Sequence, residues 1–152
     1  MIVELVLNGR PAVLEARSDE MLLSALRRAG LLSVRESCAI GMCGACTVLL
    51  DGEAVTGCLT LAAQAAGREV TTVEGIAGDR VQRAFAEAHG FQCGWCTPGF
   101  VLATRRLLET RESAGPISDE EIAEGLGGNL CRCGSYVKIA AAVRRCAEPD
   151  RC

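Results

Sequence analysis

Residues 38–58 read CAIGMCGACTVLLDGEAVTGC, and the fold of the chain is organised around this stretch. Its cysteines, Cys38, Cys43, Cys46 and Cys58, stand at the spacing C-x4-C-x2-C-x11-C, with three on one glycine-rich loop and the fourth beyond a predicted hairpin. This is the plant-type spacing of [2Fe-2S] ligands. Gly41 and Gly44 allow the backbone to approach a cluster closely and to direct N–H groups at its sulfurs. We therefore expect these four thiolates to ligate one cluster.

Two other uses of these cysteines are less consistent with the spacing. A structural zinc site usually shows paired C-x2-C knuckles. A disulfide framework requires an oxidising compartment. The first ten residues are interrupted by Glu4, Asn8 and Arg10, so no export signal is recognisable there. We therefore expect a cytoplasmic protein, in which cysteines at motif spacing are metal ligands or redox groups.

The length and composition define the class of protein. The chain has 152 residues, of which 49% are apolar, so it can bury one good core or two small ones. Ten cysteines are the unusual feature. No apolar run is long enough to predict a membrane span.

The charge excludes one class of partner. The formal net charge is −3, and the basic residues are scattered, so we expect no binding to nucleic acid. Two oxidised clusters with their thiolates would bring the charge to roughly −7. Protein partners are therefore expected.

The first half predicts a small mixed sheet with one helix across it. The expected strands cover residues 2–8, 11–16, 47–50, 53–57 and 68–74. The dipeptides Asn8-Gly9 and Asp51-Gly52 are strong hairpin signals between neighbouring strands. A helix is expected over residues 20–29, capped by Ser18 or Asp19.

The pattern changes to a helical period near Gly75–Gly78, which predicts a boundary between domains of residues 1–76 and 77–152. Four helices are expected in the second domain, and no strand. The first is expected over residues 80–89, with Asp79 as its cap and Gly90 as its stop, and the second runs from Pro98 to residue 109. The third is expected over residues 122–126, after a Ser118/Glu121 capping box, and the fourth over residues 136–145, capped by Ser135. The fold class is thus α+β, with a sheet domain before a four-helix domain.

A second set of cysteines lies in the expected helix connections. Cys93 and Cys96 form a C-x2-C pair, and Cys131 and Cys133 a C-x-C pair. Loops that join alternate helices of an antiparallel array can lie at one end, so these thiols can converge. On the residues alone, a four-cysteine zinc site remains an alternative to a cluster. A thioredoxin-like redox pair is disfavoured, because no βαβ pattern precedes Cys93.

Both sets together resemble a known family. The segments CGACTVLLDG, FQCGWCTPGF and GGNLCRCGSYVKI resemble the small iron-sulfur subunit of the xanthine oxidase family of molybdenum hydroxylases. The resemblance covers residues 2 to about 145. It implies a plant-ferredoxin-like β-grasp domain followed by a helical domain, each with one [2Fe-2S] cluster. By this resemblance the ligands are Cys38, Cys43, Cys46 and Cys58 for the first cluster and Cys93, Cys96, Cys131 and Cys133 for the second.

The sequence departs from the family at two places. Where the family commonly has Gly-Cys-Gly, this chain has Ser37-Cys38-Ala39, and Gly134-Ser135 replaces a Thr-Gly pair. The methyl group of Ala39 is expected to affect the exposure or the N–H geometry of the first cluster, and hence its potential.

The resemblance implies an electron relay without catalytic residues in this chain. Substrate is oxidised at a molybdopterin centre in a large subunit. Electrons then pass through the helical-domain cluster and the β-grasp cluster to FAD in a medium subunit, or to another acceptor. The resemblance places Gln92 and Cys133 against the pterin. The chain shows no dinucleotide fingerprint or P-loop of its own, and a hetero-oligomer such as a dimer of heterotrimers is expected. The alternative is a free-standing, diffusible ferredoxin with an extra domain.

Other residues are given structural roles. His89 is expected to favour a helix C-terminus by its charge. Trp95 is expected to shield the second cluster from water, and Arg132 either to offset cluster charge or to reach solvent. Cys146 and Cys152 are expected to remain thiols outside both ligand sets.

Overall fold

The computed structural model describes residues 1–112 and 115–147 and begins with a five-stranded mixed sheet in the order β2-β1-β5-β3-β4. The strands are β1 (Ile2–Leu7), β2 (Arg10–Glu15), β3 (Thr47–Leu50), β4 (Glu53–Thr56) and β5 (Glu69–Thr71). β1 runs parallel to β5, and the other strand pairs are antiparallel. Both expected hairpins form, with positive φ at Asn8-Gly9 (52° and 76°) and at Asp51-Gly52 (50° and 83°). Positive φ at both central residues matches the right-handed twist of the strands.

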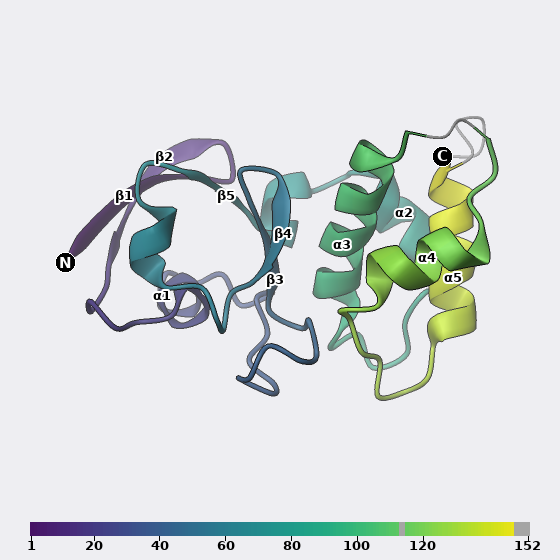
Figure 1. Ribbon diagram of the computed structural model, residues 1–152, viewed down its shortest axis with the longest axis horizontal. Coiled ribbons are helices and arrows are strands. Elements are labelled where there is room, and N and C mark those ends of the chain that lie inside the picture. Colours follow the sequence, from purple (N-terminus) through teal and green to yellow (C-terminus); the bar gives the residue numbers. More distant parts are fainter. Residues whose placement is uncertain (113–114, 148–152) are drawn as a thin grey trace.

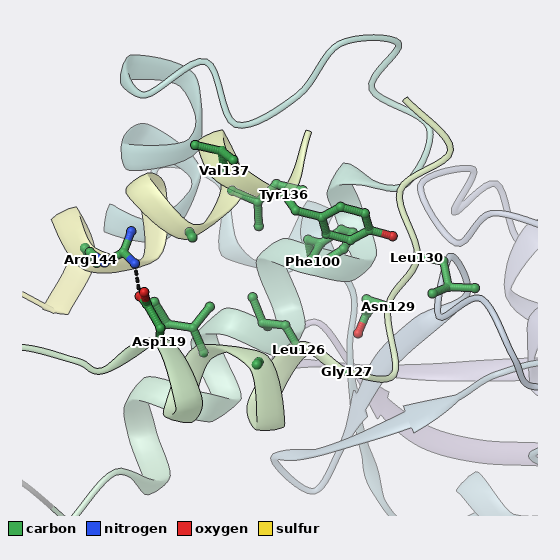
Figure 2. A pocket seen from close by; sticks show the side chains of 13 residues that line it. Phe100, Asp119, Leu126, Gly127, Asn129, Leu130, Tyr136, Val137 and Arg144 are labelled. Carbon is green, nitrogen blue, oxygen red and sulfur yellow. Dashed lines mark hydrogen bonds and ion pairs between the residues drawn. The ribbon is translucent and has the colours of Figure 1, made fainter. Parts of the chain in front are cut away.

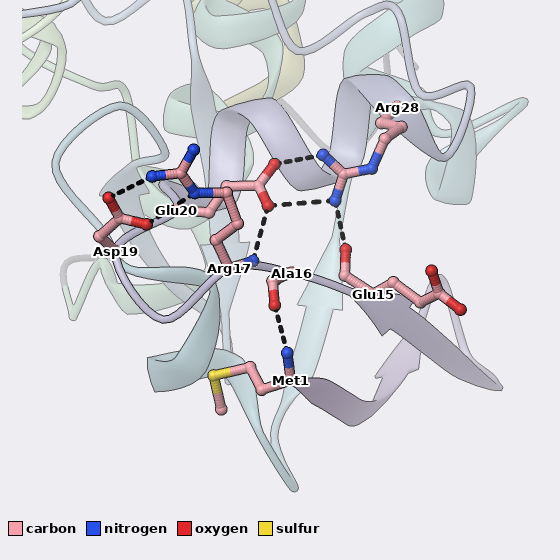
Figure 3. A network of polar contacts seen from close by, with 7 residues as sticks. All are labelled: Met1, Glu15, Ala16, Arg17, Asp19, Glu20 and Arg28. Atoms are coloured by element: carbon pink, nitrogen blue, oxygen red, sulfur yellow. Dashed lines mark hydrogen bonds and ion pairs between the residues drawn. The ribbon is translucent and has the colours of Figure 1, made fainter.

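The helix predicted over residues 20–29 is shorter and starts later, as α1 (Leu22–Arg28). Neither Ser18 nor Asp19 caps it. The N-cap is Met21, which is held extended by an antiparallel bridge to Leu61. The Asp19 carboxylate instead accepts two hydrogen bonds from the guanidinium of Arg17, at 3.0 and 2.9 Å (Figure 3). The prediction was wrong because a long-range pairing holds Met21 out of the helix.

The same polar network ties the start of the chain to α1. The Glu20 carboxylate accepts from the backbone N–H of Arg17 at 3.0 Å and pairs with Arg28 (Figure 3). The Met1 amino group donates to the Ala16 carbonyl at 2.6 Å. Solvent screens these ion pairs at the surface, so they contribute little to stability.

The last strand is also shorter than predicted. β5 ends at Thr71, and a 3₁₀ turn, η2 (Val73–Ile76), replaces the rest of the expected strand. The side chain of Asn8 binds Thr72, accepting its N–H at 2.8 Å and donating to its hydroxyl at 3.0 Å. Since this amide takes the hydrogen bond that a neighbouring strand would otherwise receive, the ladder stops there. A second 3₁₀ turn, η1 (Ala62–Ala65), was not predicted.

The second half is helical, as predicted. Its helices are α2 (Arg80–Glu87), α3 (Thr97–Thr110), α4 (Asp119–Leu126) and α5 (Tyr136–Ala147). Within residues 77–112 and 115–147 there is no strand. The Asp79 carboxylate caps α2 by accepting the N–H of Val81 at 2.8 Å. The Ser118/Glu121 capping box forms at the start of α4, as predicted.

Two helix ends differ from the prediction. At the end of α2, the residue in the left-handed conformation is His89 (φ 50°) and not the expected Gly90. Gly90 instead allows close packing, because a Cβ there would lie 3.0 Å from the Phe85 ring and 3.4 Å from Ala142. At the start of α5, the Ser135 hydroxyl is buried without a hydrogen-bond partner, so it does not cap the helix.

The capping box gives a testable expectation. Replacing Ser118 by Ala removes the acceptor of the Glu121 N–H bond, which is 3.1 Å long. We expect a loss of about 1 kcal/mol, the typical value of an N-cap side chain. The thermal midpoint measured by circular dichroism should fall accordingly. Ser18→Ala is the matched control, because Ser18 does not cap α1, and an equal fall in both variants would contradict the assignment.

The two halves lie side by side and share part of their packing (Figure 1). α1 packs in the sheet half, which has its own apolar core. Leu49 of β3 belongs instead to the core formed by the helices. The Arg106 guanidinium on α3 binds the Glu53 carboxylate on β4 at 2.6 and 2.9 Å. The loop before β3 and the α2–α3 and α4–α5 loops lie on the same side of the molecule, at the bottom of Figure 1.

Candidate metal centres

The first cysteine loop folds its backbone N–H groups toward a thiol. Ala39 and Gly41 have positive φ, 55° and 77°. Hydrogen bonds from the backbone N–H of Ile40 and then of Cys43 lower the pKa of the Cys38 thiol to about 6. N–H groups that favour a thiolate also stabilise a metal-bound sulfur. The loop therefore has the form expected of a cluster-binding loop.

Ala39 is the departure from the family pattern. Its methyl group is exposed, so it does not block the loop. Its left-handed backbone is one that an L-residue adopts at a cost of roughly 1–2 kcal/mol. The substitution thus adds local strain at this position.

The other two thiols of the first set are buried. Cys46 is 3% exposed and Cys58 5% exposed. The carbonyl of Cys46 accepts the N–H of Gly57 at 3.1 Å, which fixes the two segments together. Burial raises the pKa of the Cys46 thiol to about 11, and the Cys58 side chain is its hydrogen-bonding neighbour. A thiol of this kind loses its proton when it coordinates a metal.

In the second set, Cys131 is held by its own loop. The N–H of Ser135 donates to the Cys131 sulfur at 3.4 Å, and the Cys131 N–H donates to the Tyr136 hydroxyl at 2.9 Å. Gly134 makes the turn between them with φ 73°. Burial opposes ionisation of Cys131, but the N–H of Ser135 and other hydrogen bonds outweigh it, so the net pKa is lowered.

The remaining thiols of this set lie at different depths. Cys93 and Cys133 are exposed. The backbone N–H of Trp95, and then the Cys133 side chain, lower the pKa of Cys93. Cys96 is half-buried, and burial raises its pKa to about 12, with Cys131 as its hydrogen-bonding neighbour.

Within each set the thiols affect one another's pKa values. Hydrogen-bonding neighbours are Cys43 for Cys38, Cys58 for Cys46, Cys133 for Cys93 and Cys131 for Cys96, and Cys43 also acts on Cys46, and Cys131 on Cys93, through charge. None of these eight cysteines is in a disulfide. Within the described residues, no three Cys, His, Asp or Glu side chains converge where a single metal ion could bind. A [2Fe-2S] core is bound by four cysteines, so the four thiols of each set match the number of ligands that this core needs.

Gln92 and Cys133 lie together at the surface. The Gln92 side-chain amide donates to the Cys133 carbonyl at 3.3 Å, and both residues are exposed. The residues that the resemblance assigns to the pterin are thus neighbours on one accessible face.

The two sets of cysteines border a common cavity of about 430 Å³. Cys43 lines it from the first set, and Cys93, Cys96 and Cys131 line it from the second. Trp95 lies at the same place, 47% exposed, and the guanidinium of Arg35 stacks on its ring at 5.0 Å. Residues of both candidate centres therefore border the same cavity.

The other residues singled out in the sequence lie at different places. Arg132 is exposed and also lines this cavity. Cys146 is buried on α5, and its thiol donates to the Arg80 carbonyl at 3.9 Å, away from both sets. Cys152 lies outside the described residues. Sequence reasoning missed the contacts of Arg35, because its partner ring is distant in the chain.

Another cavity, of about 570 Å³, lies between α4 and α5 (Figure 2). Apolar side chains line most of it, and Asp119 and Arg144 pair at one end. Its lining contains none of the eight cysteines. It adjoins the second candidate centre, because Leu130 and Tyr136 line both cavities.

Comparison with known proteins identifies the family. A model described as "2Fe-2S iron-sulfur cluster binding domain" matches residues 5–74, and one described as "[2Fe-2S] binding domain" matches residues 72–144. The xanthine dehydrogenase iron-sulfur-binding subunit of Escherichia coli O157:H7 is 46% identical over 151 residues, covering 96% of this chain and 94% of that protein. The chain belongs to the iron-sulfur subunit family of the molybdenum hydroxylases.

Further relatives agree with this assignment. The nicotinate dehydrogenase small FeS subunit of Eubacterium barkeri is 44% identical, with 96% of this chain and 94% of that protein covered. In the crystal structure of quinoline 2-oxidoreductase from Pseudomonas putida 86, one chain superposes with a TM-score of 0.88 and 38% identity, covering 97% of this chain and 92% of that one. The iron-sulfur subunit described here is thus an electron-transfer component of a multi-subunit oxidoreductase. The predicted fold class and family are confirmed.

Every helix within residues 1–112 and 115–147 is too short or too polar to cross a lipid bilayer.

Proposed function

We propose that the two sets of four thiols each hold one [2Fe-2S] cluster, in domains of residues 1–76 and 77–152. The ligands would be Cys38, Cys43, Cys46 and Cys58 in the first domain and Cys93, Cys96, Cys131 and Cys133 in the second. The observation that carries this proposal is that a [2Fe-2S] domain model matches each half of the chain, residues 5–74 and 72–144, and that each half contains one set of four cysteines. A bound cluster supplies one-electron redox chemistry there. The protein contributes N–H groups directed at sulfur, burial of Cys46, Cys58 and Cys131, and a cavity that both sets border.

The accessible face around the second site supports a direction for the relay. Cys93, Cys133 and Gln92 are exposed. We assign this face to a molybdopterin-binding large subunit, with Gln92 and Cys133 against the pterin. Electrons leave through the first site to FAD in a medium subunit or to another acceptor. Burial and hydrogen bonds to sulfur are the means by which this chain sets the two potentials.

The names of the relatives support a proposal for the assembly. Their names describe subunits of xanthine and nicotinate dehydrogenases, which supports a hetero-oligomer here. We assign a dimer of heterotrimers in the cytoplasm. The absence of a disulfide among the eight cysteines is consistent with a reducing compartment.

Metal analysis of the purified complex tests the function. Two [2Fe-2S] clusters require about four irons and four acid-labile sulfides per chain. The chain should co-purify with larger molybdenum- and flavin-containing subunits. Two irons with one zinc would overturn the second cluster. Two clusters without larger subunits would instead identify a diffusible ferredoxin, and size-exclusion chromatography with metal analysis distinguishes these results.

A further inference from the structure

A buried asparagine joins the two cysteine loops. Asn129 lies on the α4–α5 loop, two residues before Cys131, and is 7% exposed. Its amide nitrogen donates to the Gly44 carbonyl at 2.9 Å and to the Thr47 hydroxyl at 3.3 Å. Both partners belong to the sheet half, and Gly44 lies between two cysteines of the first set. A buried amide with these bonds fixes one loop against the other.

Leu130, the residue after Asn129, makes a backbone hydrogen bond to the first cysteine loop. The N–H of Leu130 donates to the carbonyl of Cys43 at 2.9 Å. Cys43 belongs to the first set, and Leu130 is bonded covalently to Cys131 of the second. A single hydrogen bond therefore connects a cysteine residue of one set to the neighbour of a cysteine in the other.

The backbones at this junction are in contact. A Cβ on Gly44 would lie 2.5 Å from the Gly128 carbonyl oxygen, and a Cβ on Gly99 would lie 2.3 Å from the Gly44 carbonyl oxygen. No side chain can be inserted there without displacing a backbone atom. The contact is also distinct from the ion pair between Arg106 and Glu53, which joins other parts of the two halves.

We propose that Asn129 is a positioning residue that sets the separation of the two centres, with the Cys43–Leu130 hydrogen bond as the link between them. The proposal rests on the proposed function, since it concerns coupling between two clusters. The amide holds the carbonyl of Gly44 and so fixes the direction of the neighbouring Cys43 carbonyl toward Leu130. The rate of electron tunnelling between two centres falls as their separation grows, so a shift of one loop against the other changes the transfer rate. The junction therefore acts on the transfer step without contacting either cluster's iron.

Two variants of Asn129 test the proposal in the assembled complex. Asn129→Asp keeps the size of the side chain but loses both N–H donors, and Asn129→Ala removes the group. Each should keep the iron content and the two separate paramagnetic signals. Each should lose the magnetic splitting between the two reduced clusters. Hydrogen exchange at the Leu130 amide should accelerate by about tenfold or more, because opening of this bond becomes easier.

Asn8→Gly is the matched control. Asn8 also binds another segment through its amide, at Thr72, but lies away from the cysteine loops, and glycine suits its positive φ. It should leave both the splitting and the exchange at Leu130 unchanged. Thr47→Val removes one acceptor of the Asn129 amide and should weaken the splitting, whereas Thr47→Ser, which keeps the hydroxyl, should preserve it.

Unchanged splitting and unchanged exchange in both Asn129 variants would overturn the proposal. If these variants fail to fold, equal behaviour of Thr47→Val and Thr47→Ser would overturn it. A wild-type complex without two [2Fe-2S] signals would instead refute the proposed function. In that case the exchange rate at the Leu130 amide still decides whether Asn129 holds the junction.

Discussion

Replacing Cys131 by Ser is expected to abolish the paramagnetic signal of the helical-domain cluster and to leave that of the other domain. Cys131 is 7% exposed and receives the Ser135 N–H at its sulfur. Iron in such clusters prefers soft thiolate ligands, so a hydroxyl at this place is a poor replacement. Iron should fall from about four to about two per chain. Turnover of the complex with its acceptor should fall to background, because the relay is interrupted.

The reciprocal change and a control complete this experiment. Cys43→Ser should remove the other signal and keep that of the helical domain. Cys146→Ser changes a buried thiol that lies on α5, outside both sets, and should keep both signals. Loss of both signals from either ligand change would mean that the two sites do not assemble separately, contrary to the proposal.

Replacing Gly99 by Ala is expected to destabilise the protein by forcing its halves apart. The new Cβ would lie 2.3 Å from the Gly44 carbonyl oxygen, a backbone atom that cannot rotate away. Overpacking of this kind typically costs about 1–3 kcal/mol. Alanine also favours the helix by about 1 kcal/mol over glycine. A clash near the upper end of this range, less the gain in helix propensity, gives a net loss of about 2 kcal/mol in the free energy of unfolding, which corresponds to a fall of roughly 4–8 °C in the thermal midpoint.

Gly128→Ala is the control for this change. Gly128 lies in the same region, but a Cβ there meets no atom within 4 Å, and its φ is not in the left-handed region. Its free energy of unfolding should stay within about 0.5 kcal/mol of the wild type. Differential scanning calorimetry measures both variants. Equal midpoints for Gly99→Ala and Gly128→Ala would show that the backbones are not in tight contact.

The features that were predictable from the sequence are local ones. The two hairpins form because Asn8-Gly9 and Asp51-Gly52 tolerate positive φ. The caps at Asp79 and Ser118 form because each needs only a neighbour within the same turn. The three segments that contain the cysteines likewise resembled the family that the comparisons show.

The features that were missed depend on contacts between distant residues. Met21 does not start α1, because Leu61 pairs with it. Nothing in the spacing tells that Cys46, Cys58 and Cys131 are buried while Cys93 and Cys133 are exposed. Asn129 stood within a quoted motif, but its role depends on Gly44, which only the folded chain brings to it.

Leu49 has a consequence for recombination between relatives. Its side chain is 3% exposed and packs into the helical core although it stands on β3. A fragment ending at residue 76 would expose it to water, at a cost of about 1.5–3 kcal/mol for a leucine. In a chimaera that joins this sheet half to the helical half of a relative, the new helical half must therefore offer a pocket that fits Leu49. Exchange of complete chains preserves that match, whereas exchange of halves does not.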